Sequence, residues 1–201
     1  MNFFKRLKGH FLTVCRHKYW VGRYCFAAGL YWRGIKHDMS KFSPTEFWEG
    51  VKYYQGTSSP IDACKKENGW SRAWLHHRGR NDHHYEYFTD DYDHGGKALV
   101  MPKRPAFELI CDYLGAGRAY MGKKFSYRAE YEWWRNKCSN GLLMDQSIKD
   151  FVDYVLFALF TIEVAMQRGK KIDTKEKDFK SILEFGYENC VETSKLRGCS
   201  N

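Results

Sequence analysis

The sequence predicts an all-α protein that folds as a single domain. Apolar residues recur at intervals of three and four through most of the 201 residues, and strict two-residue alternation is rare. Only four prolines interrupt this pattern. Residues 1–201 contain no internal repeat, low-complexity tract or linker, and a chain of this length buries roughly two-thirds of its unfolded surface. One helical bundle over residues 1–201 is therefore expected.

The first third of the chain predicts two or three helices. Residues 3–35 are expected to form one or two of them, with glycines that permit a bend. The next helix should begin at Ser43, because Ser43 as N-cap, Pro44 as first residue and Glu46 at the third position form a good helix start. This helix is expected to end at about Gln55.

The middle of the chain predicts two more helices. Residues 61–77 are expected to form one helix, and residues 78–82 should break it because they contain glycine and asparagine. Residues 90–96 have the composition of a loop. Pro102 then opens a helix that carries Asp112 near its middle.

The C-terminal core helices are expected within about residues 144–193. Residues 144–168 form the central apolar helix, with Gly169 as its C-cap. After Asp173 and Thr174 a last helix runs to about Thr193, and residues 197–201 fray. Residues 123–140 are rich in Tyr, Trp, Lys and Arg and predict no defined element.

The composition predicts a cytoplasmic protein without a membrane segment. The seven cysteines are odd in number and scattered, and they form no C-x-x-C pair, as in a reducing compartment. Basic residues interrupt the apolar stretches of residues 1–20 before a signal-peptide core can form. Residues 151–166 contain Asp153 and Glu163 and fall short of the roughly 20 residues that cross a bilayer.

The charge balance favours an anionic partner. The chain carries a formal net charge of +9, but no run of five or more Lys or Arg marks a nucleic-acid-binding arm. The expected partner is an anionic small molecule, a nucleotide for preference, with nucleic acid as the alternative. Because no P-loop, dinucleotide-binding glycine pattern or G-x-S-x-G elbow is present, motors, NAD enzymes and serine hydrolases of those types are disfavoured.

The motif HDMSK is the most informative feature of the chain. It places two metal-ligand side chains, His37 and Asp38, one helical turn before Lys41. The Lys41 ammonium would reach a phosphate oxygen as a point charge. The competing interpretation is a helix-end His-Asp pair beside a solvated lysine.

A second motif, HHRGRNDHH, brings four imidazoles into nine positions around a predicted break. His77 and His84 would lie about 10 Å apart along an unbroken helix, too far to share one ion. The break would bring them closer, or they would serve two metals. Arg78 and Arg80 border the histidines and would hold phosphate, unless they are solvated arginines at a helix end.

These residues carry a family resemblance. Their order H…HD…H…H…D resembles that of the HD-domain metal-dependent phosphohydrolase superfamily, and HDMSK is similar to its HDxGK variant with Ser40 in place of glycine. The stretches HDMSKFSPTEF, AWLHHRGRNDHHYEY and MPKRPAFELICDYLGAG more closely resemble an uncharacterised bacterial and phage family of unknown function with an HDxSKF motif. That closer resemblance covers about residues 10–125, the expected metal-site core.

The superfamily resemblance implies an all-helical fold around one or two divalent ions of Mn, Fe, Co, Ni or Zn. Asp38 would bridge two ions, and Lys41 would contact phosphate. For the intermediate histidine pair, His77 and His84 are preferred, with His76 and His83 as alternatives. The implied metal ligands are His17, His37, Asp38, His77, His84 and Asp112.

The function expected from these observations is a metal-dependent phosphohydrolase that acts on a nucleotide or another small phosphoester through a metal-activated water. Asp38 and Lys41 would be its catalytic residues. The alternatives are a diiron oxygenase of HD-like type and a non-catalytic, metal-stabilised accessory protein that binds nucleic acid or a host partner. Glu108, one turn before Asp112, would orient a ligand or lie on the surface, and the surface interpretation is preferred.

Overall fold

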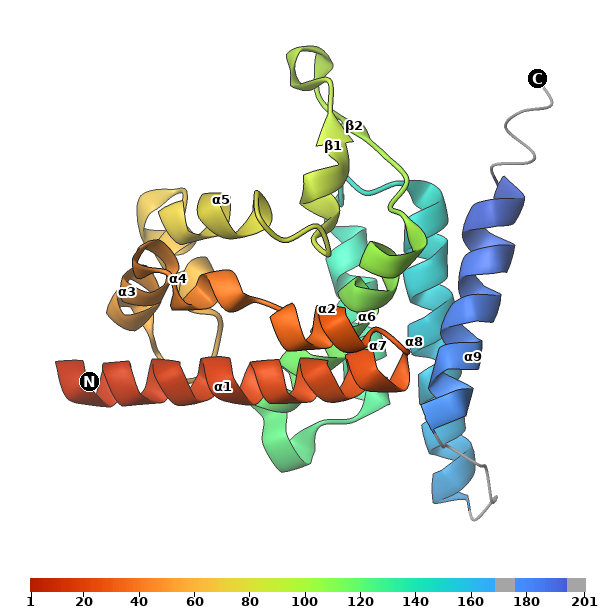
Figure 1. Cartoon of the computed structure of the whole chain (residues 1–201), viewed down its shortest axis with the longest axis horizontal. Helices are drawn as coiled ribbons and strands as arrows, with labels where there is room; N and C mark the ends of the chain where they lie inside the picture. Colours follow the sequence, from red (N-terminus) through yellow and green to blue (C-terminus); the bar gives the residue numbers. More distant parts are fainter. Residues whose placement is uncertain (169–175, 195–201) are drawn as a thin grey trace.

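The computed structural model describes residues 1–168 and 176–194, and it confirms the all-α fold class (Figure 1). The expected Gly169 cap, the Asp173-Thr174 helix start and the frayed residues 197–201 lie outside the described residues. The α-helices are α1 (Phe3–Ala27), α2 (Tyr31–Lys36), α3 (Pro44–Tyr53), α4 (Pro60–Asn68), α5 (Arg72–Arg78), α6 (Lys103–Met121), α7 (Tyr127–Ser139), α8 (Gln146–Gln167) and α9 (Glu176–Tyr187).

Short elements connect these helices. The strands β1 and β2 form an antiparallel hairpin in which Thr89 pairs with Ala98 and Asp90 with Lys97, and this hairpin projects from the helical body (Figure 1). The short elements are the 3-10 turns η1 (Met39–Phe42), η2 (Tyr85–Phe88), η3 (Tyr92–His94) and η4 (Gly122–Lys124), the strands β1 (Thr89–Asp90) and β2 (Lys97–Ala98), and the π-helical turn η5 (Glu188–Glu192).

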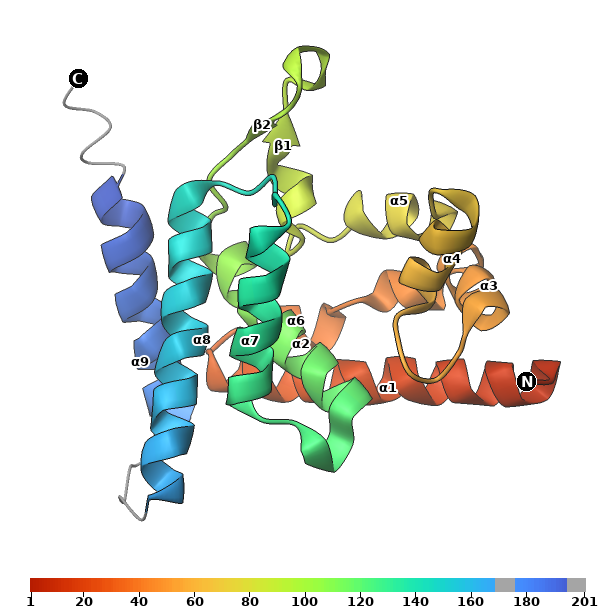
Figure 2. The same cartoon turned by 180° about the vertical axis from the view of Figure 1, so that it is seen from behind.

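The core is organised around α6. This helix packs along α1 on one side and contacts α7 and α8 on the other, and residues 105–115 of α6 are buried throughout. Figures 1 and 2 show α7, α8 and α9 side by side near the C-terminal end of α1, while α3, α4 and α5 gather over its N-terminal half. On the site-facing part of α6, Asp112 lies beside His17 of α1, and Glu108 lies beside His37 and His83.

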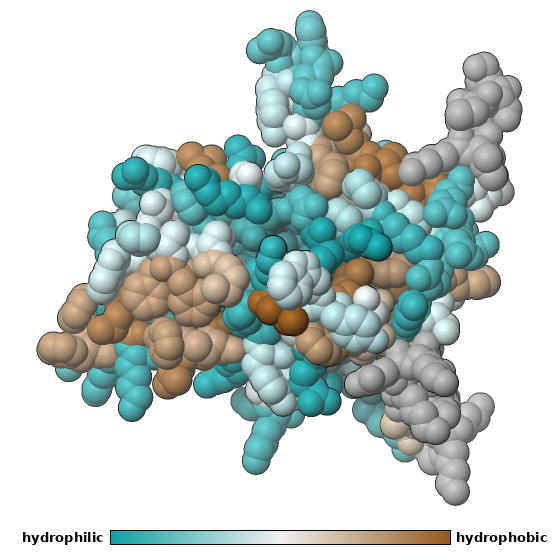
Figure 3. All heavy atoms as spheres, in the orientation of Figure 1, coloured by the Kyte–Doolittle hydropathy of each residue, from teal (hydrophilic) through white to brown (hydrophobic). Residues whose placement is uncertain are grey.

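The face in Figure 3 separates apolar from hydrophilic side chains. Apolar side chains cover the N-terminal part of α1, where Phe4 is 77% and Phe11 46% exposed. Hydrophilic side chains surround the projecting hairpin (Figure 3).

The predicted helix start at Ser43 is confirmed. The Ser43 hydroxyl accepts a hydrogen bond from the backbone N–H of Glu46 at 3.4 Å, and Pro44 is the first helical residue.

Residues 3–35 form two helices, α1 and α2, because Gly29 adopts a φ of 76° between them. The two helices approach closely, since a Cβ on Gly34 would lie 2.8 Å from the Cβ of Cys25.

The single helix expected over residues 61–77 is wrong, because the structure has two helices there. Gly69 ends α4 in the left-handed conformation with a φ of 79°. Ser71 then caps α5 by accepting a hydrogen bond from the backbone N–H of Trp74 at 3.0 Å. Apolar residues keep their helical spacing across this turn, which explains the error. The turn packs α5 against α3 and directs His77 into the interior.

Residues 123–140, which predicted no element, contain α7. Ser126 caps this helix, since its hydroxyl accepts a hydrogen bond from the backbone N–H of Ala129 at 3.1 Å. Trp134 is fully buried and Glu130 is only 5% exposed. The helix was not predicted because the segment is rich in polar and charged residues. It packs only a few large side chains into the core.

The buried carboxyl group of Glu130 should make the stability of the protein depend on pH. Its carboxylate packs against α6, and a Cβ on Gly117 would lie 2.1 Å from Oε2. Burial, together with the charge of Asp112, raises the pKa of Glu130 to about 8 from an ordinary 4.5. Between these two pH values the folded chain keeps a proton on Glu130 that the unfolded chain has released. The folded state therefore loses stability as pH rises from 4.5 to 8.

We expect the change in the free energy of unfolding caused by Glu130→Gln to be about 3 kcal/mol more favourable at pH 8 than at pH 5. Each unit of pKa shift corresponds to about 1.4 kcal/mol. The glutamine stays neutral at both pH values. Urea unfolding of both proteins at pH 5 and pH 8 measures the difference. Equal pH dependence in the two proteins would show that the carboxyl group ionises normally in the folded state.

Candidate metal centre

Among the described residues, three groups of His, Asp and Glu side chains could hold a metal ion, and two of them share Asp38. The third group, His37, His83 and Glu108, takes one histidine from each of these two clusters. The first cluster consists of His17, His37, Asp38 and Asp112. His17 lies on α1, Asp112 at the middle of α6 as predicted, and the other two between α2 and η1. His17 Nε2 lies 3.1 Å from both Asp38 Oδ2 and Asp112 Oδ1. His37 Nε2 lies 3.3 and 3.4 Å from the same two oxygens. Two nitrogens and two oxygens from three separate segments thus converge on one point.

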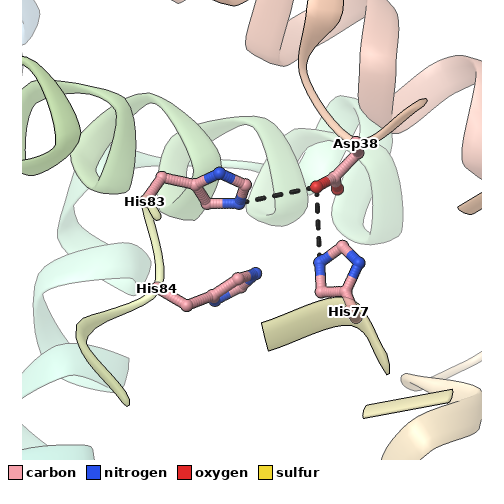
Figure 4. A group of neighbouring side chains, drawn as sticks. All are labelled: Asp38, His77, His83 and His84. Atoms are coloured by element: carbon pink, nitrogen blue, oxygen red, sulfur yellow. Dashed lines mark ion pairs between the residues drawn. The ribbon is translucent and has the colours of Figure 1, made fainter. Parts of the chain in front are cut away.

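The second cluster consists of Asp38, His77, His83 and His84, which are drawn in Figure 4. His77 comes from the end of α5, and the two adjacent histidines come from the irregular segment before η2. Asp38 Oδ1 lies 3.3 Å from His77 Nε2 and 3.5 Å from His83 Nε2. Each of the four side chains offers one ligand atom, and these atoms lie within 4.8 Å of one another.

Asp38 belongs to both clusters and is 1% exposed. Its Oδ2 faces His17 and His37, whereas its Oδ1 faces His77 and His83. The expectation that the His-Asp pair continues on a helix is wrong. His37 ends α2, and Asp38 adopts a left-handed φ of 54°. This conformation is unfavourable for a residue other than glycine, and the surrounding packing maintains it. The break lets one carboxylate reach both clusters.

The second cluster contains buried polar atoms that make no hydrogen bond. Within the described residues, Asp38 Oδ1, His83 Nε2 and His84 Nε2 are buried and make no hydrogen bond. Each such atom costs about 1–3 kcal/mol when it stays unsatisfied. Imidazole nitrogens and carboxylate oxygens are the ligands that Mn, Fe, Co, Ni and Zn accept. The donor set therefore fits a divalent transition metal.

Carboxylates on the outer side of the histidines fix their orientation. The Nδ1–H of His37 donates to Glu108 Oε1 at 2.8 Å, and that of His77 donates to Glu46 Oε2 at 2.8 Å. His83 Nδ1 lies 3.4 Å from the same Glu108 oxygen. Because Nδ1 carries the proton, the Nε2 lone pair of a neutral ring is directed into the cluster.

Glu108 is 3% exposed, so the surface interpretation of this residue is wrong. One carboxylate orients a histidine of each cluster, and Arg33 forms an ion pair with it from outside. Arg33 also pairs with Asp82, next to His83. The position of Glu108 one helical turn before Asp112 indicated that it could orient a metal ligand. Helical spacing alone did not show that the face of α6 with these two residues is buried.

Electrostatics keep the carboxylates of both clusters ionised. Burial alone would raise the pKa of Asp38, but the charges of His37, Lys41 and His77 hold it well below its ordinary value. Hydrogen bonds from His17 and His37 likewise overcome burial and lower the pKa of Asp112. Burial lowers the pKa of His84 far below its usual range, with the charges of His83 and His77 adding to the effect, so its ring stays neutral and able to bind a cation.

The surroundings of His37 favour its protonated form. Burial would lower its pKa, but the charge of Asp38 and hydrogen bonds with Asp112, Asp38 and Glu108 raise it well above the ordinary value. A metal ion at Nε2 would replace this proton, so metal binding should release protons.

A cavity of about 210 Å³ opens onto both clusters. His17 and Asp112 of the first cluster and His77 and His84 of the second line it, together with Lys41. The Lys41 ammonium lies 2.5 Å from Asp38 Oδ2. Burial would lower the pKa of Lys41, but the charges of Asp38 and Asp112 raise it, so the side chain is a cation.

Some of the predicted site residues lie in the two clusters and others do not. The six expected ligands lie in the two clusters, and His83 joins His84 there rather than replacing it. His76 instead bonds Glu46 Oε1 at 2.7 Å. Arg78 lines a separate hollow with Tyr85 and Lys137. Arg80 lines another hollow, which the cluster residues His37 and His83 also border. Neither arginine is positioned at the cavity shared by the clusters, as the described lining residues show.

Residues 6–157 match the family of unknown function DUF5662, and the chain therefore belongs to this family. The match extends beyond the expected residues 10–125 and includes both clusters. No curated protein and no solved structure matches the chain. Among the described helices, none is both long and apolar enough to traverse a lipid bilayer.

The position of Glu108 predicts an effect on metal affinity. We expect Glu108→Gln to weaken metal binding about 10- to 100-fold, as when a carboxylate that orients a ligand histidine is lost. The amide still accepts from one ring but no longer provides the charge. Competition with a coloured chelator measures the affinity. The matched control is Glu132→Gln, which changes an exposed acid paired with Arg128 on α7 and should leave the affinity unchanged.

Proposed function

We propose that this protein is a metal-dependent phosphohydrolase of small phosphoesters, with nucleotides as the first candidates. The observation that supports this best is the placement of Asp38, whose two oxygens face two buried His/Asp clusters beside one cavity. A lone metal site of structural type needs neither a bridging carboxylate nor an adjoining cavity that contains a cation.

Each cluster would hold one divalent ion. The first would use His17, His37, Asp38 and Asp112, and the second Asp38, His77, His83 and His84. When bound, such ions lower the pKa of a coordinated water toward about 7 and polarise a phosphoryl oxygen.

Lys41 would bind a non-bridging phosphoryl oxygen through its ammonium group. It lies at the cavity wall next to Asp38, and its charge would stabilise the negative charge that develops in the transition state. The net charge of +9 would raise the local concentration of an anionic substrate. Glu46 and Glu108 would hold the ligand histidines in one orientation throughout the reaction.

Elemental analysis of protein purified without a histidine tag is the direct test. We expect about two transition-metal ions per chain, from one ion for each cluster. Protein loaded with Mn, Co or Ni should hydrolyse nucleotides with release of phosphate, or a generic phosphodiester with release of its alcohol. Full metal occupancy without any hydrolysis would contradict the proposal. Oxygen consumption with an iron-linked absorption band would instead support a diiron oxygenase.

Lys41→Ala should separate catalysis from metal binding. We expect kcat/KM to fall about 100- to 1,000-fold, as when one preorganised group that stabilises transition-state charge is removed. Metal content should stay unchanged, because an ammonium is not a ligand. Lys66→Ala, at an exposed position of α4, is the matched control. If Lys41→Ala leaves function intact while chelation lowers the melting temperature, a non-catalytic, metal-stabilised protein is the better interpretation.

A further inference from the structure

His10 lies on the wall of the cavity, remote from the clusters. It belongs to the same face of α1 as His17, seven residues and about 10 Å further along the helix. The imidazole is 8% exposed, and its centroid lies 5.3 Å from the ring of Phe47 and 6.1 Å from that of Tyr54. The ring therefore packs between two aromatic side chains and borders the cavity.

Gly50 makes room for this imidazole. The edge formed by Cε1 and Nε2 of His10 lies so close to α3 that a Cβ on Gly50 would come within 2.3 Å of both atoms. Any larger residue at position 50 would push the ring away from α3. The contact therefore fixes the depth at which the imidazole borders the cavity.

The described lining of the cavity contains one lysine, Lys41, and no arginine. Lys41 and the bound ions would favour one phosphoryl group. The wall also contains the carboxylates of Glu46, which bonds His76 and His77, and of Glu49, which accepts a hydrogen bond from Ser71. His10 adds no charge there at neutral pH, because burial and the charge of Lys41 lower its pKa to about 4. A second or third phosphate would thus find no lysine or arginine besides Lys41 on the described lining.

The size of the cavity limits the substrate further. A cavity of about 150 Å³ holds a molecule the size of benzene. The 210 Å³ available here suits one phosphoryl group with a compact organic group attached. Val14, Ile61 and Ala116 contribute apolar surface to the walls. His10 contributes polar atoms, as do Thr13, Ser59 and Tyr120.

From this arrangement we infer that the site selects phosphate monoesters with a compact, uncharged leaving group, and that His10 determines specificity by hydrogen bonding to a hydroxyl or amide of that group. The inference rests on the proposed hydrolase function and adds the substrate class. It disfavours nucleoside triphosphates and polynucleotides as substrates.

The test compares metal-loaded wild-type protein on five substrates: a nucleoside 5′-monophosphate, the matching triphosphate, a sugar phosphate, phenyl phosphate and a short oligonucleotide. We expect kcat/KM to be at least about 10-fold higher for the monophosphate than for the triphosphate, because two more phosphates find no lysine or arginine besides Lys41 on the described lining. Activity that favours the triphosphate or the oligonucleotide would overturn this inference and leave the hydrolase function standing. Absence of hydrolysis with every substrate would overturn both.

Three variants examine His10 itself. His10→Phe keeps the ring packing against Phe47 and Tyr54, and it should raise KM for the sugar phosphate about 3- to 10-fold, the effect of one hydrogen bond, with kcat nearly unchanged. KM for phenyl phosphate, whose leaving group has no hydrogen-bonding substituent, should not move. His10→Gln should restore much of the loss, and Gly50→Ala should reproduce it by displacing the ring.

An equal change in KM for the sugar phosphate and for phenyl phosphate would show that His10 acts only through packing. Melting temperatures of all variants are measured alongside, so that a fall in activity from unfolding is recognised. If His10→Phe melts early, Gly50→Ala takes its place, and it must raise KM for the sugar phosphate but not for phenyl phosphate for the inference to stand.

Discussion

Asp38→Asn is expected to empty both clusters of metal and to lower kcat/KM at least about 1,000-fold, which corresponds to roughly 4 kcal/mol of transition-state stabilisation. The reason is that one carboxylate serves both clusters through its two oxygens. Asparagine keeps one oxygen, but it directs an NH₂ group at the imidazole nitrogens on the other side. Metal content per chain and hydrolysis are measured on the same preparation.

Two further variants make this result interpretable. Asp112→Asn changes the first cluster only, so it should leave about one ion per chain where Asp38→Asn leaves none. Asp62→Asn, at an exposed position in the first turn of α4, should keep wild-type metal content and activity. If Asp38→Asn retains two ions, the carboxylate does not bridge.

Folding of the Asp38 variant must be verified, because removal of one partner from a buried ionic group costs about 3–5 kcal/mol. Lys41 and His37 would lose their counter-charge. Helical circular dichroism and a melting curve establish whether the chain still folds. If it does not, the metal content of Asp112→Asn alone decides whether the clusters hold separate ions.

Chelation of the metal is expected to lower the melting temperature by about 5–11 °C. An ion present at 100 times its dissociation constant stabilises the folded state by about 2.7 kcal/mol, and each kcal/mol shifts the midpoint of a chain of this size by roughly 2–4 °C. Asp38 Oδ1, His83 Nε2 and His84 Nε2 are buried and make no hydrogen bond with the described residues, so an ion would satisfy them. Calorimetry before and after dialysis against a chelator measures the shift.

The Asp38→Asn protein provides the control for chelation. Because it should hold no metal, its melting temperature should not respond to the chelator. An unchanged melting temperature in the wild type would mean that the clusters are stable with protons in place of metal, as the raised pKa of His37 allows. That result would count against a resident metal.

Local signals in the sequence determined much of the fold. The helix start at Ser43 could be predicted because an N-cap and a following proline act within a single turn. Asp112 could be placed at mid-helix because apolar periodicity extends on both sides of it. The types and order of the ligand residues were also visible, since imidazole and carboxylate groups at such density indicate metal chemistry wherever the chain folds.

The tertiary structure decided where those side chains point. Asp38 adopts the left-handed conformation although no glycine in the motif indicates a break there. Packing by the surrounding residues maintains this conformation. His83 and His84 both face inward because the chain between α5 and η2 is irregular, and helical spacing would have separated them. Glu108 proved to be buried, while Arg78 and Arg80 turned toward other hollows. Periodicity records which residues lie on one face of an element, but the direction of a side chain at a break depends on backbone dihedrals that distant segments fix.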